Sequence, residues 1–208
     1  MLNTEFVPAP QPSKSLTIVL HGLGDSIEGY RWLPSALRIP WMNYLLVNAP
    51  DDYYGGFSWY EYDGEPAPGI RRSRELLAEL LNEQKARGFA VGEMTLFGFS
   101  QGCLMTLELA LRFPERLAGL VGISGYVFEP EVLLKERSEV ALTQRVLMTH
   151  GTEDPLIPIG RVREQVGLLQ GAGVQIEWNE FAKAHTIDGE RELKLIRSFI
   201  EQGYPERT

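Results

Sequence analysis

The sequence predicts an α/β fold in which a mostly parallel central sheet is covered by helices on both faces. Short apolar runs rich in β-branched residues alternate along the chain with amphipathic helical stretches, an order typical of parallel strands joined by crossover helices. Most of these runs are continuously apolar, which indicates strands buried on both faces. The chain has 208 residues and shows no internal repeat or linker, so residues 1–208 are expected to form one domain.

Six segments fit such strands, and several of them end at a glycine, where the chain can turn. In chain order they are Leu16–Leu20, Tyr44–Pro50, Glu93–Ser100, Leu117–Gly125, Arg145–Gly151 and Val174–Phe181, the last with more alternation.

Helical patterns lie between most of these strands. They cover residues 73–88, 101–113, 159–173 and 189–203. Each of the first, third and fourth places its apolar residues on one stripe. The expected inward residues are Leu76, Leu77, Leu80 and Leu81 in the first, Val162, Val166 and Leu169 in the third, and Leu193, Ile196, Phe199 and Ile200 in the last.

Two segments interrupt the alternation. Residues 51–70 form an aromatic-rich loop in this interpretation, and residues 126–144 contain a short helix. Both follow the carboxyl end of a strand, the edge at which open α/β sheets bind ligands.

Composition excludes several classes of protein. The formal net charge of −8 and the pI of about 5.0 disfavour a nucleic-acid partner, because a phosphate backbone would be repelled. No run of about 18 apolar residues predicts an integral membrane segment, and the N-terminus does not match a signal peptide. The single cysteine, Cys103, cannot form an internal disulfide, so a cytoplasmic protein is expected.

Ser100 lies between two glycines where a strand pattern changes to a helical pattern. The stretch Gly98-Phe99-Ser100-Gln101-Gly102 matches the G-x-S-x-G nucleophile elbow, in which a sharp turn exposes the hydroxyl and the glycines relieve crowding. The five-residue pattern alone is weak, but the flanking strand and helix strengthen it. The alternative is a glycine-rich turn with a solvated serine.

A serine hydroxyl needs a base to become a good nucleophile. With this elbow the chain order is serine, acid, histidine, and only His185 leaves room for an acid after Ser100. Asp154, on the loop after a strand, is the expected acid; the alternative is a turn or helix cap. His21 and His150 also end strands and are expected to tie neighbouring loops together.

Attack by a serine creates an oxyanion that backbone N–H donors stabilise. The expected donors are Gln101, directly after the nucleophile, and Leu23, in the loop after the first central strand. The stretch GLGDSI lacks the third glycine of a dinucleotide-binding loop, because Ile27 stands there, so that interpretation is rejected.

Four motifs together resemble the phospholipase/carboxylesterase family, which includes the acyl-protein thioesterases. They are LHGLGD, GFSQG, HGTEDPLIP and a late HT, in the family's order, and the match spans about Leu16 to Phe199. The resemblance implies an α/β-hydrolase fold without a large lid and hydrolysis of carboxylic esters or thioesters. It places the triad on Ser100, Asp154 and His185 and the oxyanion hole on Leu23 and Gln101, with no metal or organic cofactor.

The chain departs from the family pattern at three places. Cys103 and Ala184 stand where glycines are usual, and the loop after the second strand lacks the proline–histidine start of the eukaryotic thioesterases. The sequence is therefore more similar to the bacterial carboxylesterase branch. Cys103 is expected to be a buried structural residue, because the reactive cysteine of dienelactone hydrolases would stand at the elbow itself.

The loop aromatics leave the substrate open. They either pack over the sheet edge or line an acyl-binding groove, and Trp59 is the best single choice for the groove, with Tyr60 and Phe57 beside it. An exposed aromatic loop would also favour a homodimer or lipid contact. The expected partner is a small ester or thioester of modest acyl length. A protein thioester, a lysophospholipid and a non-catalytic binding module stay as alternatives.

Overall fold

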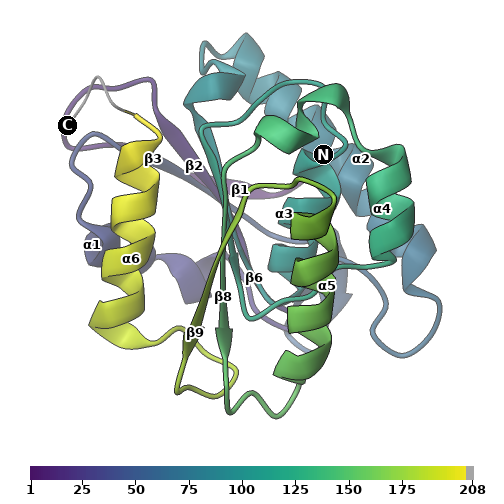
Figure 1. Cartoon of the computed structure of the whole chain (residues 1–208). Helices are drawn as coiled ribbons and strands as arrows, with labels where there is room; N and C mark the ends of the chain where they lie inside the picture. The colour runs from purple at the N-terminus through teal and green to yellow at the C-terminus, as the bar shows by residue number, and fades with distance from the viewer. Residues whose placement is uncertain (205–208) are drawn as a thin grey trace.

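A computed structural model describes residues 1–204 and shows a seven-stranded sheet between two layers of helices (Figure 1). The strand order is β1-β3-β2-β6-β7-β8-β9; β1 is antiparallel to β3, and all other pairs are parallel. The strands are β1 (Thr4–Val7), β2 (Leu16–Leu20), β3 (Asn43–Val47), β6 (Met94–Phe99), β7 (Gly119–Ile123), β8 (Val146–Gly151) and β9 (Ile176–Phe181), with a separate hairpin of β4 (Asp51–Tyr53) and β5 (Gly56–Ser58).

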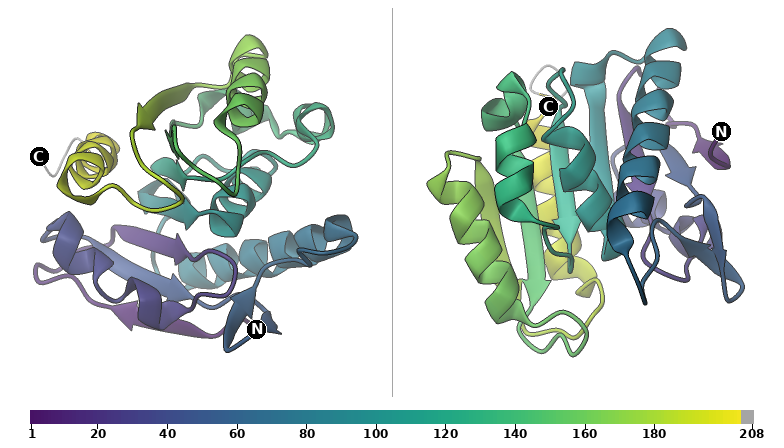
Figure 2. Two further views of the ribbon diagram at one scale, coloured as in Figure 1. Left: turned by 90° about the horizontal axis from the view of Figure 1, so that it is seen from below. Right: turned by 90° about the vertical axis from the view of Figure 1, so that its right-hand side faces the viewer.

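The helices divide between the two faces of the sheet (Figure 2). One face carries α1 (Leu33–Leu37) and α6 (Gly189–Gln202); the other carries α2 (Pro66–Ala86), α3 (Gln101–Ala110), α4 (Pro130–Glu136) and α5 (Ile159–Gly171). Three short 3-10 helices are η1 (Ile27–Tyr30), η2 (Val91–Glu93) and η3 (Glu139–Thr143). Two apolar cores result, one under each helical layer.

The predicted α/β fold and all six predicted strands are confirmed. The expected inward stripes of α5 and α6 are buried, and so are those of α2 except Leu76, which is half-buried. Gly88 follows α2 with a φ of 93°, as expected of a left-handed cap. Among residues 1–204, no helix is both long and apolar enough to cross a membrane.

The structure corrects the interpretation of residues 51–70 as one long loop. A hairpin, β4–β5, occupies its first part, and α2 begins at Pro66, seven positions before the predicted start at Ser73. The proline-rich beginning of the chain also contains β1, and the short α1 was not predicted. Proline is acceptable in the first turn of a helix, because the N–H groups there have no intrahelical partner.

Candidate active site

Ser100 stands on a strained turn between β6 and α3. Its backbone is in an unusual conformation, with φ 54° and ψ −114°. A Cβ on Gly98 would lie 2.1 Å from the carbonyl oxygen of Gly102, and a Cβ on Gly102 would lie 2.1 Å from that of Leu20. Both glycines are therefore needed for β2, β6 and α3 to approach this closely, and the turn that they permit places the half-buried Ser100 in the wall of a cavity.

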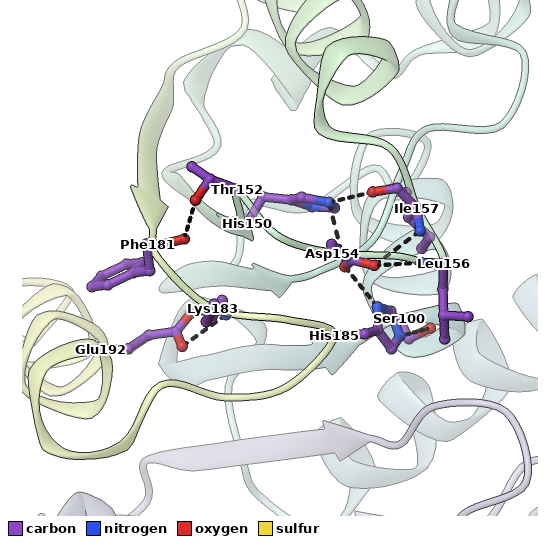
Figure 3. A network of polar contacts seen from close by, with 10 residues as sticks. All are labelled: Ser100, His150, Thr152, Asp154, Leu156, Ile157, Phe181, Lys183, His185 and Glu192. Atoms are coloured by element: carbon purple, nitrogen blue, oxygen red, sulfur yellow. Dashed lines mark hydrogen bonds and ion pairs between the residues drawn. The ribbon is translucent and has the colours of Figure 1, made fainter.

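A hydrogen-bonded chain links Ser100 to two side chains from distant loops (Figure 3). His185 Nε2 lies 3.0 Å from Ser100 Oγ, and His185 Nδ1 lies 2.7 Å from Asp154 Oδ2. The loops after β6, β8 and β9 carry these three residues, and parallel strands bring their carboxyl ends to one edge of the sheet. The structure thus brings together the three side chains that sequence reasoning selected.

Asp154 is held as an ionised carboxylate. Its Oδ1 accepts hydrogen bonds from the backbone N–H groups of Leu156 and Ile157, both at 2.9 Å. Burial by itself would raise the pKa of Asp154, but the hydrogen bonds from Ile157, His185 and Leu156 outweigh it and lower the pKa. The carboxylate therefore accepts the Nδ1–H of His185, which leaves Nε2 as the basic nitrogen that faces the serine.

His150 lies beside the same carboxylate and is fully buried. Its Nε2 is 2.9 Å from the carbonyl oxygen of Ile157 and 3.5 Å from Asp154 Oδ2, so this nitrogen faces acceptors and carries the proton (Figure 3). Burial lowers the pKa of His150 and keeps the ring neutral. This geometry fits the loop-tying role expected for it. His21 fits the same role, because Ala49 N–H donates to its Nε2 at 3.0 Å.

A buried ion pair supports the loop that carries His185. Lys183 Nζ lies 2.7 and 2.8 Å from the two carboxylate oxygens of Glu192, and the two side chains are 2% and 0% exposed. The backbone N–H of Asp188 donates to the same carboxylate at 2.5 Å. The pair therefore joins both ends of the loop to the first turn of α6 (Figure 3).

The two expected oxyanion donors border the same cavity as Ser100. Gln101 is the first residue of α3, where a backbone N–H has no intrahelical acceptor. Leu23 lies in a tight turn closed by Asp25 N–H and the carbonyl oxygen of Gly22 at 3.3 Å, in which Gly24 has a φ of 77°. Their role as donors stays a prediction.

A cavity of about 480 Å³ opens over Ser100. Its wall combines the candidate site with aromatic and aliphatic side chains: Gly22, Leu23, Asp25, Tyr60, Tyr62, Phe99, Ser100, Gln101, Tyr126, Leu156, Ile157, Pro158, Arg161 and His185. Of the three expected substrate-binding residues, only Tyr60 lines it. Sequence reasoning missed Tyr126 and the Leu156–Ile157 pair, although the latter lies within the HGTEDPLIP motif that was recognised.

Trp59 and Phe57 do not line this cavity. The expected contact of the fully buried Trp59 with substrate is corrected, and that of the half-buried Phe57 stays a prediction. Trp59 is 0% exposed, and its indole N–H donates to the carbonyl oxygen of His21 at 2.9 Å. Phe57 pairs through its backbone with the oxyanion loop, at 2.9 Å with Gly24 and 3.0 Å with Asp25. Both residues are therefore hydrogen-bonded to residues 21–25, the stretch that contains Leu23.

Cys103 is the buried structural residue that the sequence predicts. Its side chain is 0% exposed and packs close to Gly122 and Gly125, and burial raises the pKa of its thiol to about 12. A thiol held in this state is a poor nucleophile.

A half-buried serine that lines a cavity at a strand–helix elbow, hydrogen-bonded through a histidine to a carboxylate, identifies an α/β-hydrolase of the serine hydrolase class. Comparison with known proteins then gives the family. The family model for Phospholipase/Carboxylesterase matches residues 2–203, and the chain belongs to this family.

Individual relatives agree with this assignment. Acyl-protein thioesterase 1 of Schizosaccharomyces pombe is 31% identical over 174 residues, 76% of each chain. The protein of the same name from Kluyveromyces lactis is 32% identical over 167 residues, 72% of this chain and 73% of its own. Esterase PE8 is a similar solved structure, with a TM-score of 0.83 and 26% identity over 97% of this chain and 98% of PE8. The Bacillus cereus carboxylesterase has a TM-score of 0.82 at 19% identity, over 98% of this chain and 95% of its own, a likeness of fold. The bacterial carboxylesterase branch stays a prediction.

Proposed function

We propose that this protein is a carboxylesterase that cleaves carboxylic esters through an acyl-enzyme on Ser100. One observation carries the proposal: the hydrogen-bonded chain from Asp154 through His185 ends at a serine that faces an accessible cavity. A binding module would not need this alignment. The order of these hydrogen bonds also assigns the roles of the three residues.

The first half of the reaction forms the acyl-enzyme. Ser100 Oγ attacks the ester carbonyl carbon while His185 Nε2 takes the hydroxyl proton. Asp154 stabilises the imidazolium that forms, and the N–H groups of Leu23 and Gln101 stabilise the oxyanion, each worth about 2.7–4 kcal/mol of barrier. The intermediate then collapses: the bond from carbon to the leaving oxygen breaks, and His185 returns the proton to the alcohol.

The second half releases the acid. A water molecule gives a proton to His185 Nε2 and attacks the acyl carbon, and the bond between this carbon and Ser100 Oγ breaks as the proton returns to the serine. Tyr60, Tyr126 and Leu156 supply aromatic and aliphatic wall for an acyl group of modest length.

The test is hydrolysis of p-nitrophenyl esters of increasing chain length by the wild type and by Ser100→Ala. The proposal expects a maximum at short or medium chains, loss of activity in Ser100→Ala, and covalent labelling of Ser100 by a fluorophosphonate probe. A protein that neither labels nor hydrolyses any of the esters would be a binding module instead.

Thioester cleavage is a second candidate, because the relatives from Schizosaccharomyces pombe and Kluyveromyces lactis are acyl-protein thioesterases. A lysophospholipid substrate would use the same first step. Rates that rise steadily toward long acyl chains, and a higher kcat/KM for a thioester than for its oxygen ester, would favour these substrates over short carboxylic esters. The homodimer and the cytoplasmic location expected from the sequence stay predictions.

A further inference from the structure

A second cavity, of about 320 Å³, adjoins the one over Ser100. Asp25, Phe99 and His185 belong to the walls of both cavities. Its other lining residues come from η1, the residue that precedes α1, the loop before α6 and α6 itself: Gly29, Tyr30, Trp32, Thr186, Ile187, Gly189 and Leu193. The proposed reaction places the acyl group in the first cavity and assigns no part of the substrate to the second cavity.

The position of His185 decides which part of an ester the second cavity faces. The leaving oxygen takes its proton from His185, so the leaving group lies next to that ring. Ser100, Leu23 and Gln101 line the first cavity only, together with the apolar wall near Leu156. An ester whose acyl chain follows that wall therefore directs its alcohol part past His185 and into the second cavity.

Asp25 is the acidic residue in the wall of this second cavity. Its side chain is half-buried, and its Oδ1 accepts the backbone N–H of Ser26 at 2.7 Å. None of the ion pairs formed within residues 1–204 involves Asp25. A carboxylate that is partly shielded from water and has no cationic partner attracts a cation more strongly than a solvated one.

Trp32 completes the second wall beside this carboxylate. Gly29 joins the two residues: a Cβ on Gly29 would lie 2.0 Å from Asp25 Oδ1, and its carbonyl oxygen accepts the Trp32 indole N–H at 2.7 Å. The Trp32 side chain is fixed by that bond yet remains 43% exposed. An indole beside a carboxylate is the combination that binds organic ammonium groups.

We propose that the second cavity is a leaving-group subsite for alcohols that carry an ammonium group, with Asp25 and Trp32 as the cation-binding pair. This inference rests on the proposed esterase function and deepens it by naming the class of alcohol. Binding of the cation orients the ester oxygen toward His185, so the preference appears in kcat/KM.

The experiment compares two esters of the same acid, the choline ester and the 3,3-dimethylbutyl ester, which have nearly the same shape but differ by one positive charge. The wild type is expected to favour the choline ester by about five- to tenfold in kcat/KM, the size of one partly exposed charge pair with a cation–π contact. The preference is expected to shrink between 0.05 and 0.5 M NaCl.

Variants locate the origin of the preference. Asp25→Asn is expected to reduce the ratio to about two or less, and Trp32→Leu to reduce it about twofold. Glu28→Gln is the matched control, because Glu28 has the same charge in the same segment but is 79% exposed and lies outside both walls. Its ratio is expected to equal that of the wild type. The ratio cancels any general loss of activity in a variant.

The outcomes separate this inference from the esterase function. Equal rates on both esters in the wild type, or a preference that persists in folded Asp25→Asn, would overturn the subsite and leave the esterase intact. A protein that cleaves neither ester and resists the fluorophosphonate probe would overturn both. If Asp25→Asn fails to fold, the ratio of Trp32→Leu compared with that of Glu28→Gln decides the inference: equal ratios in these two variants would overturn the subsite.

Discussion

The buried pair of Lys183 and Glu192 gives the sharpest test of how the His185 loop is held. Glu192→Gln keeps the shape of the side chain but removes the charge that neutralises Lys183, whose side chain is 2% exposed. Burial already lowers the pKa of Lys183, with the attraction of Glu192 opposing it. Leaving one buried charge without its partner costs about 3–5 kcal/mol, a third or more of the stability of many proteins.

Urea unfolding measures this loss. With a slope of about 3 kcal/mol/M, Glu192→Gln and Lys183→Met are each expected to lower the midpoint by roughly 1 to 2 M. The double variant Lys183→Met/Glu192→Leu replaces both charges by apolar groups and is expected to recover most of the loss. Single variants that unfold within about 0.3 M of the wild type, or a double variant that loses as much as both singles together, would refute the argument.

Three further predictions follow from the same contacts. Gly98→Ala is expected to lower the free energy of unfolding, measured by a thermal melt, by about 3 kcal/mol or more, because its methyl group would clash with the Gly102 carbonyl oxygen. Gly167→Ala is the control: a Cβ there has no atom within 4 Å, and the variant is expected to be slightly more stable than the wild type. Asp154→Asn is expected to lower kcat about 10⁴-fold with little change in KM, as expected when the histidine tautomer is lost; a loss below about tenfold would contradict its assigned role. Burial lowers the pKa of His150 in the folded protein below its ordinary 6.5. At a pH between the lowered pKa and 6.5 the unfolded chain therefore binds more protons than the folded one, so the free energy of unfolding falls as the pH drops below 6.5. His150→Gln is expected to show a smaller difference in Tm between pH 7.5 and 5.5 than the wild type, and an equal difference would remove His150 as the cause.

The parts of the site that could be predicted are those fixed by chain order. Ser100 was identifiable because its glycines mark the turn itself, and Asp154 and His185 because parallel strands bring successive loops to one edge. These inferences need only the sequence positions of the residues. None of them requires knowledge of how a particular side chain is oriented.

Side-chain orientation is the information that the sequence lacks. Trp59 was assigned to the substrate groove because aromatic residues often line such grooves, yet its indole N–H finds the carbonyl oxygen of His21 and the ring is buried. The start of α2 was predicted wrongly for a related reason. Gly69 suggests a loop, but a Cβ there would lie 2.9 Å from the Cβ of Tyr60, so the glycine serves close packing of a helix. Such contacts exist only once distant segments meet.

The segment that contains Trp59 is hydrogen-bonded to both sides of the proposed oxyanion hole. On one side of the segment from Phe57 to Tyr60, the Phe57 backbone is hydrogen-bonded to Gly24 and Asp25, in the loop that contains Leu23. On the other side, the Gln101 side chain accepts the Trp59 N–H at 2.9 Å and donates to the Tyr60 carbonyl oxygen at 2.9 Å.

One short segment is therefore bonded to both backbone stretches that carry the proposed oxyanion donors. Oxyanion stabilisation depends on donors that are already in place before charge develops, since any rearrangement at that moment would raise the barrier. The aromatic segment, for which the sequence left both packing and a substrate groove open, thus links the backbone stretches of Leu23 and Gln101 by hydrogen bonds. Only Tyr60, at its end, turns toward the cavity.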